Sequence, residues 1–158
     1  MRNKQKGFSL IELLIVVAII LIIAAIAIPN LLRAKMAANE ASAVGSMRTL
    51  NTSSVEYSTT YGGFPSALSA LGGPAGGTAT SSSAELIDAV LAGGTKSGYS
   101  FTYTTGATDS NGNILAYTLT AVPTSVGTTG QRQFFTDQSG VIRANATGAA
   151  SVNSTPLS

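Results

Sequence analysis

Glu12 is the residue whose chemistry most needs an explanation in this chain of 158 residues. Every residue from Leu13 to Ile28 is apolar, so the Glu12 carboxylate stands at the edge of a long hydrophobic run. A charged group in a membrane span costs on the order of 3 kcal/mol near the centre and less toward the surface, and it usually marks a site with a partner. The position of Glu12 therefore raises the question of which group compensates its charge.

The remaining composition disfavours catalysis. The chain has no histidine and no cysteine, so it lacks the commonest general base, the commonest metal ligand, thiol nucleophiles and disulfide bonds. We expect no enzymatic activity, no cofactor and no bound metal. The net charge is +2, but three of the nine basic residues precede Gly7. Because no clustered basic face is evident in the rest, we expect no nucleic-acid partner.

The element that must position Glu12 is the N-terminal segment. Residues 8–28 would extend about 31 Å as a helix, close to the roughly 30 Å thickness of the hydrocarbon layer, so they can span a membrane. Three basic residues precede this segment, while Arg33, Lys35 and Glu40 follow it. The positive-inside rule then places the N-terminus in the cytoplasm and the rest of the chain outside. What remains is enough for one small domain of about 100 residues.

The string GFSLIE at residues 7–12, with a basic leader before it and an apolar run after it, closely resembles the class III leader of type IV pilins and of the related pseudopilins. This resemblance implies that residues 1–7 are a leader, which a prepilin peptidase removes by cutting between Gly7 and Phe8. It also implies methylation of the new Phe8 amine. Family behaviour further implies that Glu12 meets the Phe8 amine of a neighbouring subunit during assembly, a pairing that would neutralise two charges in an apolar fibre core.

Two other interpretations of the segment remain open. A permanent signal anchor explains the apolar run but gives Glu12 no role. A secretory signal peptide would be cut near Ala25 to Ala27, where small residues offer a cleavage site, although the run is long and Pro29 follows closely. In either case the chain would be a membrane-anchored or secreted binding module.

Pro29 ends the uninterrupted apolar run. A proline inside a helix removes one hydrogen bond and clashes with the preceding turn, so we expect a kink or a locally loosened helix there. The resemblance to pilins implies that the segment before Pro29 can melt when the subunit enters a filament. Apolar residues then recur at intervals near 3.6, which predicts an amphipathic helix over residues 29–61. Gly62 and Pro65 predict its end.

The rest of the chain predicts a connection and a sheet. Residues 62–98 are rich in Gly, Pro and Ser, and they predict a variable connection with one short helix capped by Ser83. Residues 99–145 predict an antiparallel sheet of about four strands, because apolar and polar residues alternate between clusters of turn formers. The predicted strands are 99–105, 114–122, 132–136 and 141–144. Residues 146–158 are mostly small and polar, and they predict a flexible tail.

Asp109, Asn111 and Asn113 have an alternating spacing that resembles the start of a calcium loop. Major pseudopilins of type II secretion typically carry a calcium site in this part of the chain. Here, however, no acidic residue stands at the far end of a loop of about twelve residues. We interpret the segment as a turn, and this favours a pilin over a pseudopilin.

The predicted fold is α+β: a long N-terminal α-helix, membrane-spanning in its first half at 8–28, whose second half packs against a small antiparallel sheet. The predicted function is that of a major pilin-like structural subunit of a type IV pilus, polymerised through its apolar helix, with a type II secretion pseudopilin as the alternative. The expected partners are other copies of the chain, the prepilin peptidase, an inner-membrane assembly platform and the membrane itself. The precursor would cross the bacterial inner membrane once, and the product would be an extracellular pilus, or a periplasmic pseudopilus in the alternative.

Overall fold

The computed structural model describes residues 7–74 and 76–157. The chain divides into two compact units, Met1–Lys35 and Met36–Ser158. One helix, α1 (Leu10–Tyr61), contributes to both units. The three basic residues of the predicted leader 1–7 lie outside the described residues. They are Arg2, Lys4 and Lys6.

Helix α1 begins at Leu10, two residues after the start of the predicted segment 8–28. Residues 7–9 have no regular structure. Its end at Tyr61 agrees with the predicted stop, since Gly62 adopts a φ of +83° that ordinary residues disfavour. Pro29 lies inside α1, and the helix is continuous on both sides of it. No interruption of the helix therefore occurs at Pro29 in the subunit.

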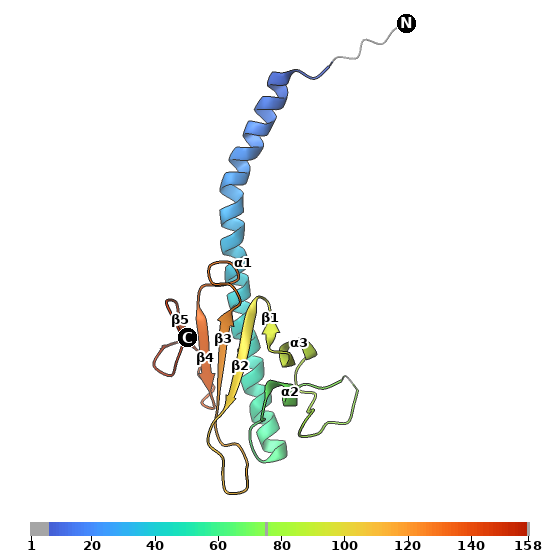
Figure 1. Cartoon of the computed structure of the whole chain (residues 1–158), viewed down its shortest axis with the longest axis vertical. Coiled ribbons are helices and arrows are strands. Elements are labelled where there is room, and N and C mark those ends of the chain that lie inside the picture. Colours follow the sequence, from blue (N-terminus) through green and yellow to red (C-terminus); the bar gives the residue numbers. More distant parts are fainter. Residues whose placement is uncertain (1–6, 75, 158) are drawn as a thin grey trace. The chain divides into compact units, whose positions relative to one another are not determined.

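In the second unit, the helix from Met36 onward lies along a six-stranded sheet (Figure 1). The strands follow each other in chain order and every neighbouring pair is antiparallel. They are β1 (Thr95–Lys96), β2 (Tyr99–Thr105), β3 (Tyr117–Pro123), β4 (Gln133–Asp137), β5 (Arg143–Asn145) and β6 (Thr155–Pro156). The predicted α+β class is confirmed, with the second half of the helix contributing to a shared core. The core joins one face of α1 to the sheet through Ala43, Met47, Leu50, Tyr57, Tyr99, Phe101, Tyr117, Leu119, Ala121 and Phe134.

The expected count of about four strands is wrong, because β1 and β6 lie at the two edges of the sheet. Each has only two residues, which is too short to show an alternating pattern. Strand β1 turns into β2 through Ser97 and Gly98, whose φ values of 51° and 73° are those of a type I′ hairpin. The dipeptide Ser97-Gly98 is therefore the feature of the sequence from which the β1–β2 hairpin could have been predicted.

The connection also differs from the prediction in its helices. Two four-residue helices occur, α2 (Leu68–Leu71) and α3 (Ala89–Ala92). The cap of α3 is Asp88, whose Oδ1 accepts a hydrogen bond from the Leu91 N–H at 2.9 Å, and not Ser83. A helix from Ser83 is excluded because Glu85 has a φ of 55°.

The segment predicted as a flexible tail contains structure. It includes β6, and the Leu157 N–H donates to the Ile142 carbonyl at 2.8 Å. Ala150 is buried and Leu157 packs against the core. The composition of this segment gave no hint of its pairing, because a two-residue edge strand is held by backbone hydrogen bonds and not by its side chains.

Candidate functional site

The N-terminal end of α1 holds the residues that the sequence singles out. Gly7 and Phe8 precede the helix, and no atom of another part of the described chain lies where a Gly7 side chain would begin. Phe8 is 81% exposed. The peptide bond between them therefore lies in exposed backbone outside the helix, as a protease substrate requires.

Glu12 lies in the first turn of α1 and has a partner within its own chain. The Ser9 N–H donates to Glu12 Oε2 at 2.9 Å, and Ser9 Oγ accepts a long hydrogen bond from the Ile11 N–H at 3.4 Å. The Ser9 carbonyl accepts from the N–H groups of Glu12 and Leu13 at 3.1 and 3.3 Å. Ser9 is thus the residue that caps the helix, and Glu12 caps it reciprocally.

This arrangement is a variant of the capping box, whose sequence signature is Ser or Thr followed three residues later by Glu. The Ser9 hydroxyl accepts from the N–H of Ile11, two residues on, and not from that of Glu12. The signature Ser9-Leu10-Ile11-Glu12 is present in the sequence, so the cap was predictable from these two residues and not from Glu12 alone. Ser9 is thus a helix-capping residue that the sequence-based predictions above do not include.

The apolar residues that follow Glu12 are exposed in the subunit. An 18-residue window of α1 has a mean hydropathy of 3.3 and none of it is buried. By length and composition this is a candidate membrane span, and it is the single such helix in the described ranges. Leu21, Ile22 and Ile23 are each at least 60% exposed. A face of this kind needs either lipid or other apolar helices around it.

The unit from Met36 onward, called the head below, carries a buried carboxylate on α1, that of Glu40. Its Oε1 accepts hydrogen bonds from the backbone N–H groups of Gln131 and Arg132 at 2.8 and 3.0 Å, and its Oε2 pairs with Arg132 Nε at 2.7 Å. Burial by itself would raise the pKa of Glu40, but these donors outweigh it and hold the pKa below the usual value. Glu40 fastens the loop before β4 to the helix.

A second buried polar group is Asn51. Its Nδ2 donates to Thr136 Oγ1 and to the Gly140 carbonyl, while its Oδ1 accepts from the Tyr117 hydroxyl at 3.1 Å. These partners come from three segments of the sheet region. Glu40 and Asn51 therefore explain why the helix face contains polar residues, and both roles are structural.

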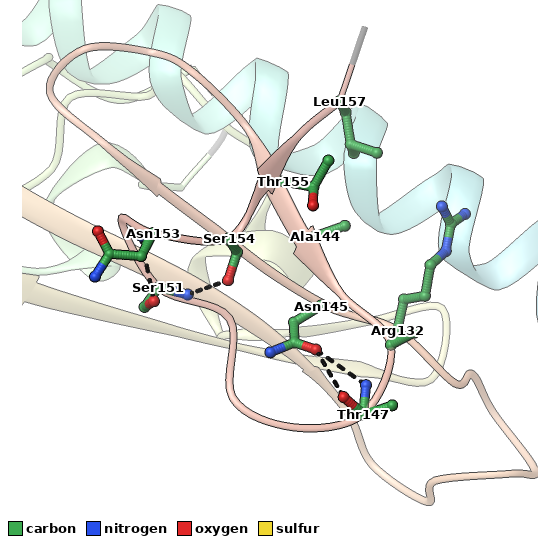
Figure 2. Close-up of a pocket in the computed structure, with 10 residues that line it drawn as sticks. Arg132, Ala144, Asn145, Thr147, Ser151, Asn153, Ser154, Thr155 and Leu157 are labelled. Carbon is green, nitrogen blue, oxygen red and sulfur yellow. Dashed lines mark hydrogen bonds between the residues drawn. The ribbon is translucent and has the colours of Figure 1, made fainter.

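A pocket with a volume of about 620 Å³ lies beside the loop between β5 and β6 (Figure 2). Its polar groups mostly bond to each other: Asn145 Oδ1 accepts from the Thr147 N–H at 3.0 Å, and the Ser151 N–H donates to Ser154 Oγ at 3.0 Å. Arg132 is the single titratable residue in its lining, and its Nε already pairs with Glu40. The pocket offers no arrangement of a nucleophile with a base.

The Asp109 segment folds as a turn. Asp109 Oδ1 accepts from the N–H groups of Asn111 and Asn113, both at 2.8 Å, and Oδ2 accepts from Asn113 Nδ2. These bonds hold the pKa of Asp109 below its usual value, the side-chain amide of Asn113 contributing most. Within the described ranges no group of three or more His, Cys, Asp or Glu side chains is placed to hold a metal ion.

Comparison with known proteins addresses the N-terminal segment. The profile of the prokaryotic N-terminal methylation motif matches residues 2–28. The type IV wide pilus major component PilA4 of Thermus thermophilus is 68% identical over 40 residues in the N-terminal region. That match covers 25% of this chain and 30% of the relative's length. The motif match at residues 2–28 includes Gly7, Phe8, Ser9 and Glu12. Together the two comparisons confirm the resemblance drawn from GFSLIE.

Proposed function

Since this chain carries the N-terminal segment of the type IV pilin family, we propose that it is a structural subunit of a type IV pilus, made as a membrane-anchored precursor and polymerised through α1. The observation that carries this proposal is the methylation motif at residues 2–28, which coincides with an apolar helical run that the subunit leaves exposed. A subunit whose most apolar segment lacks cover needs many copies, or a membrane, to complete it.

The energetics of the apolar run support polymerisation. Burial of one large aliphatic side chain gains about 1.5–3 kcal/mol relative to exposure in water. Large aliphatic side chains are exposed along the run from Leu10 to Leu32. In the precursor, lipid would cover them. In the product, the same surface of neighbouring copies would cover them, so extraction from the membrane need not expose the run to water.

Cleavage between Gly7 and Phe8 would create the cation that Glu12 needs. The new Phe8 amine is positively charged, methylated or not, and it lies at the very end of the apolar segment. A carboxylate and an ammonium group in apolar surroundings are tolerated only when they are paired. We propose that the Glu12 carboxylate forms an ion pair with the Phe8 amine of a neighbouring subunit. Prepilin peptidase would process the chain, and an inner-membrane assembly platform would assemble it.

A pilus is the better supported of the two filament types. The curated relative is itself a pilus component, and Asp109 is held within a turn by its own loop. In the proposed arrangement the head emerges on the outer side of the inner membrane before assembly and lies on the surface of an extracellular fibre afterwards.

The deciding experiment combines protein chemistry with fibre isolation. Intact mass and N-terminal sequencing of the native product should give a chain that begins at methylated Phe8, and sheared surface fibres should contain it. An N-terminus at Met1 or Ile28 in a monomeric product would refute the proposal. Fibres that form only on overexpression would indicate a pseudopilus.

The role of Glu12 is tested by Glu12→Ala and Glu12→Gln. Both should reduce fibre yield at least tenfold without changing membrane insertion of the precursor, because each removes the negative charge. Glu56→Ala is the matched control, since Glu56 is an exposed glutamate on the same helix. Normal fibre yield from both Glu12 variants would contradict the pairing.

A further inference from the structure

We propose that Ser9 is a positioning residue for Glu12: through the capping box it holds the Glu12 carboxylate at the start of α1, so that the acceptor for a neighbouring N-terminus is already formed in the single subunit. The proposal rests on the assembly function proposed above. It assigns to Ser9 a role that goes beyond its place in the string GFSLIE.

The geometry starts from the backbone. The first N–H groups of a helix have no partner within it, and in apolar surroundings an unpaired N–H costs several kcal/mol. Ser9 provides its hydroxyl to the Ile11 N–H, and Glu12 provides Oε2 to the Ser9 N–H at 2.9 Å. The capping box therefore provides acceptors for two backbone N–H groups at the helix end, those of Ser9 and Ile11.

The same bonds determine where the charge lies. A glutamate side chain has several rotatable bonds, and an exposed one samples many positions. Here the bond to Ser9 turns the carboxylate back toward the N-terminal side of its own helix. Ser9 is the residue next to Phe8, so the carboxylate is held within one residue of the position that becomes the chain end.

Only one carboxylate oxygen, Oε2, carries the bond to Ser9. An ionised carboxylate accepts several hydrogen bonds, so the other oxygen can receive an ammonium group while the cap stays intact. The neighbouring N-terminus would then bind a carboxylate whose conformational freedom has already been lost. Pre-organisation of this kind lowers the cost of association.

Four substitutions separate this role from general effects on the helix. Ser9→Ala removes the capping hydroxyl and Ser9→Thr keeps it. Ser58→Ala is the matched control, because it removes a partly exposed hydroxyl from the same helix outside the apolar run. Glu12→Gln keeps an oxygen that can accept from the Ser9 N–H but removes the charge.

The first measurement needs no polymer. In the full chain in detergent micelles, nuclear Overhauser contacts between the residue 9 amide proton and the Glu12 γ protons report the cap. Ser9→Ala keeps the backbone N–H that donates to Glu12, but it removes the hydroxyl that holds residue 9 against the Ile11 N–H in its capping position. The substitution should therefore reduce this contact at least twofold and speed exchange of the Ile11 amide about fivefold, whereas Ser9→Thr and Glu12→Gln should retain the contact. An unchanged contact and exchange rate in Ser9→Ala would overturn the cap.

The second measurement is fibre yield. Ser9→Ala should lower it about threefold to tenfold, Ser9→Thr should keep it near wild type, and Ser58→Ala should leave it within twofold of wild type. Loss of the amide contact in Ser9→Ala with normal fibre yield would overturn the positioning role. If the wild-type chain forms no fibres, the assembly function fails instead, while the first measurement still decides whether the cap exists.

Discussion

Glu40 shows at the residue scale how a charged side chain is accommodated in the core of the head. Its carboxylate is buried, yet it accepts two backbone hydrogen bonds and pairs with Arg132. Burial of Tyr99, together with the nearby Glu40 charge, raises the pKa of Tyr99 to about 12, so its hydroxyl stays protonated and donates to the Arg132 carbonyl at 2.8 Å. These bonds fasten the strand region to the helix where the head begins.

We expect Glu40→Ala to destabilise the head by about 2–4 kcal/mol, because it leaves two buried backbone N–H groups and a guanidinium without their acceptor. The measurement is denaturant unfolding of the full chain in detergent, followed by tyrosine fluorescence. Glu56→Ala, on the exposed face of α1, should change stability by less than about 0.5 kcal/mol. Equal stability of the Glu40 and Glu56 variants would contradict the assignment.

The contribution of Glu40 should also depend on pH. Because its donors lower the pKa in the folded state below the ordinary value of 4.5, the charged form is favoured by folding. The stabilisation is fully present above about pH 4.5 and is lost as the pH falls through the lower folded pKa. The stability difference between wild type and Glu40→Ala should therefore shrink between pH 7 and about pH 3, as measured by unfolding curves at each pH.

At the scale of elements, the last segment of the chain is part of the sheet. Strand β6 pairs with β5, and Arg143 Nη1 donates to the Ser154 carbonyl at 3.2 Å. Removal of residues 149–158 would expose the edge of β5 and the core surface under Leu157. We expect this truncation to lower the melting temperature by about 5–15 °C. Val152→Ala, at an exposed position of the same segment, is the control, and a truncated chain that melts with wild type would show that the segment adds nothing.

Pro29 is the other element-scale case. The helix is continuous through it in the subunit, although proline cannot donate a backbone hydrogen bond and costs about 3 kcal/mol in a helix interior. We propose that this local weakness is used on assembly, where the segment before Pro29 melts. Cryo-electron microscopy should then show non-helical backbone between Leu21 and Asn30 in wild-type fibres and continuous helix in Pro29→Ala fibres. A continuous helix in the wild-type fibre would refute the proposal.

At the scale of the whole molecule, the two units differ in what they need for stability. The unit from Met36 onward has its own core and sheet, whereas the described part of the first unit consists mainly of an exposed apolar helix. We expect residues 36–158 to form a soluble folded monomer in water, while the full chain requires detergent. Light scattering after size exclusion checks both, and aggregation of the 36–158 fragment would show that its core depends on the first unit.

The sequence by itself determined the features that depend on local chemistry. The leader motif, the apolar run and the helix end at Gly62 follow from residue types at fixed spacings, and β2 (Tyr99–Thr105) matches its predicted bounds because its side chains alternate strictly. The cap at Ser9 and Glu12 was also local, and so it was available in the sequence before the structure showed it.

Only the tertiary structure decided the features that depend on contacts between distant residues. Glu40 meets Gln131 and Arg132 across about 90 positions of sequence, and Asn51 meets Thr136 across a similar separation. The edge strands β1 and β6 exist because a neighbouring strand presents unpaired backbone groups to them. Such pairings leave no periodic trace in the sequence, since the backbone that forms them is the same for nearly every residue type.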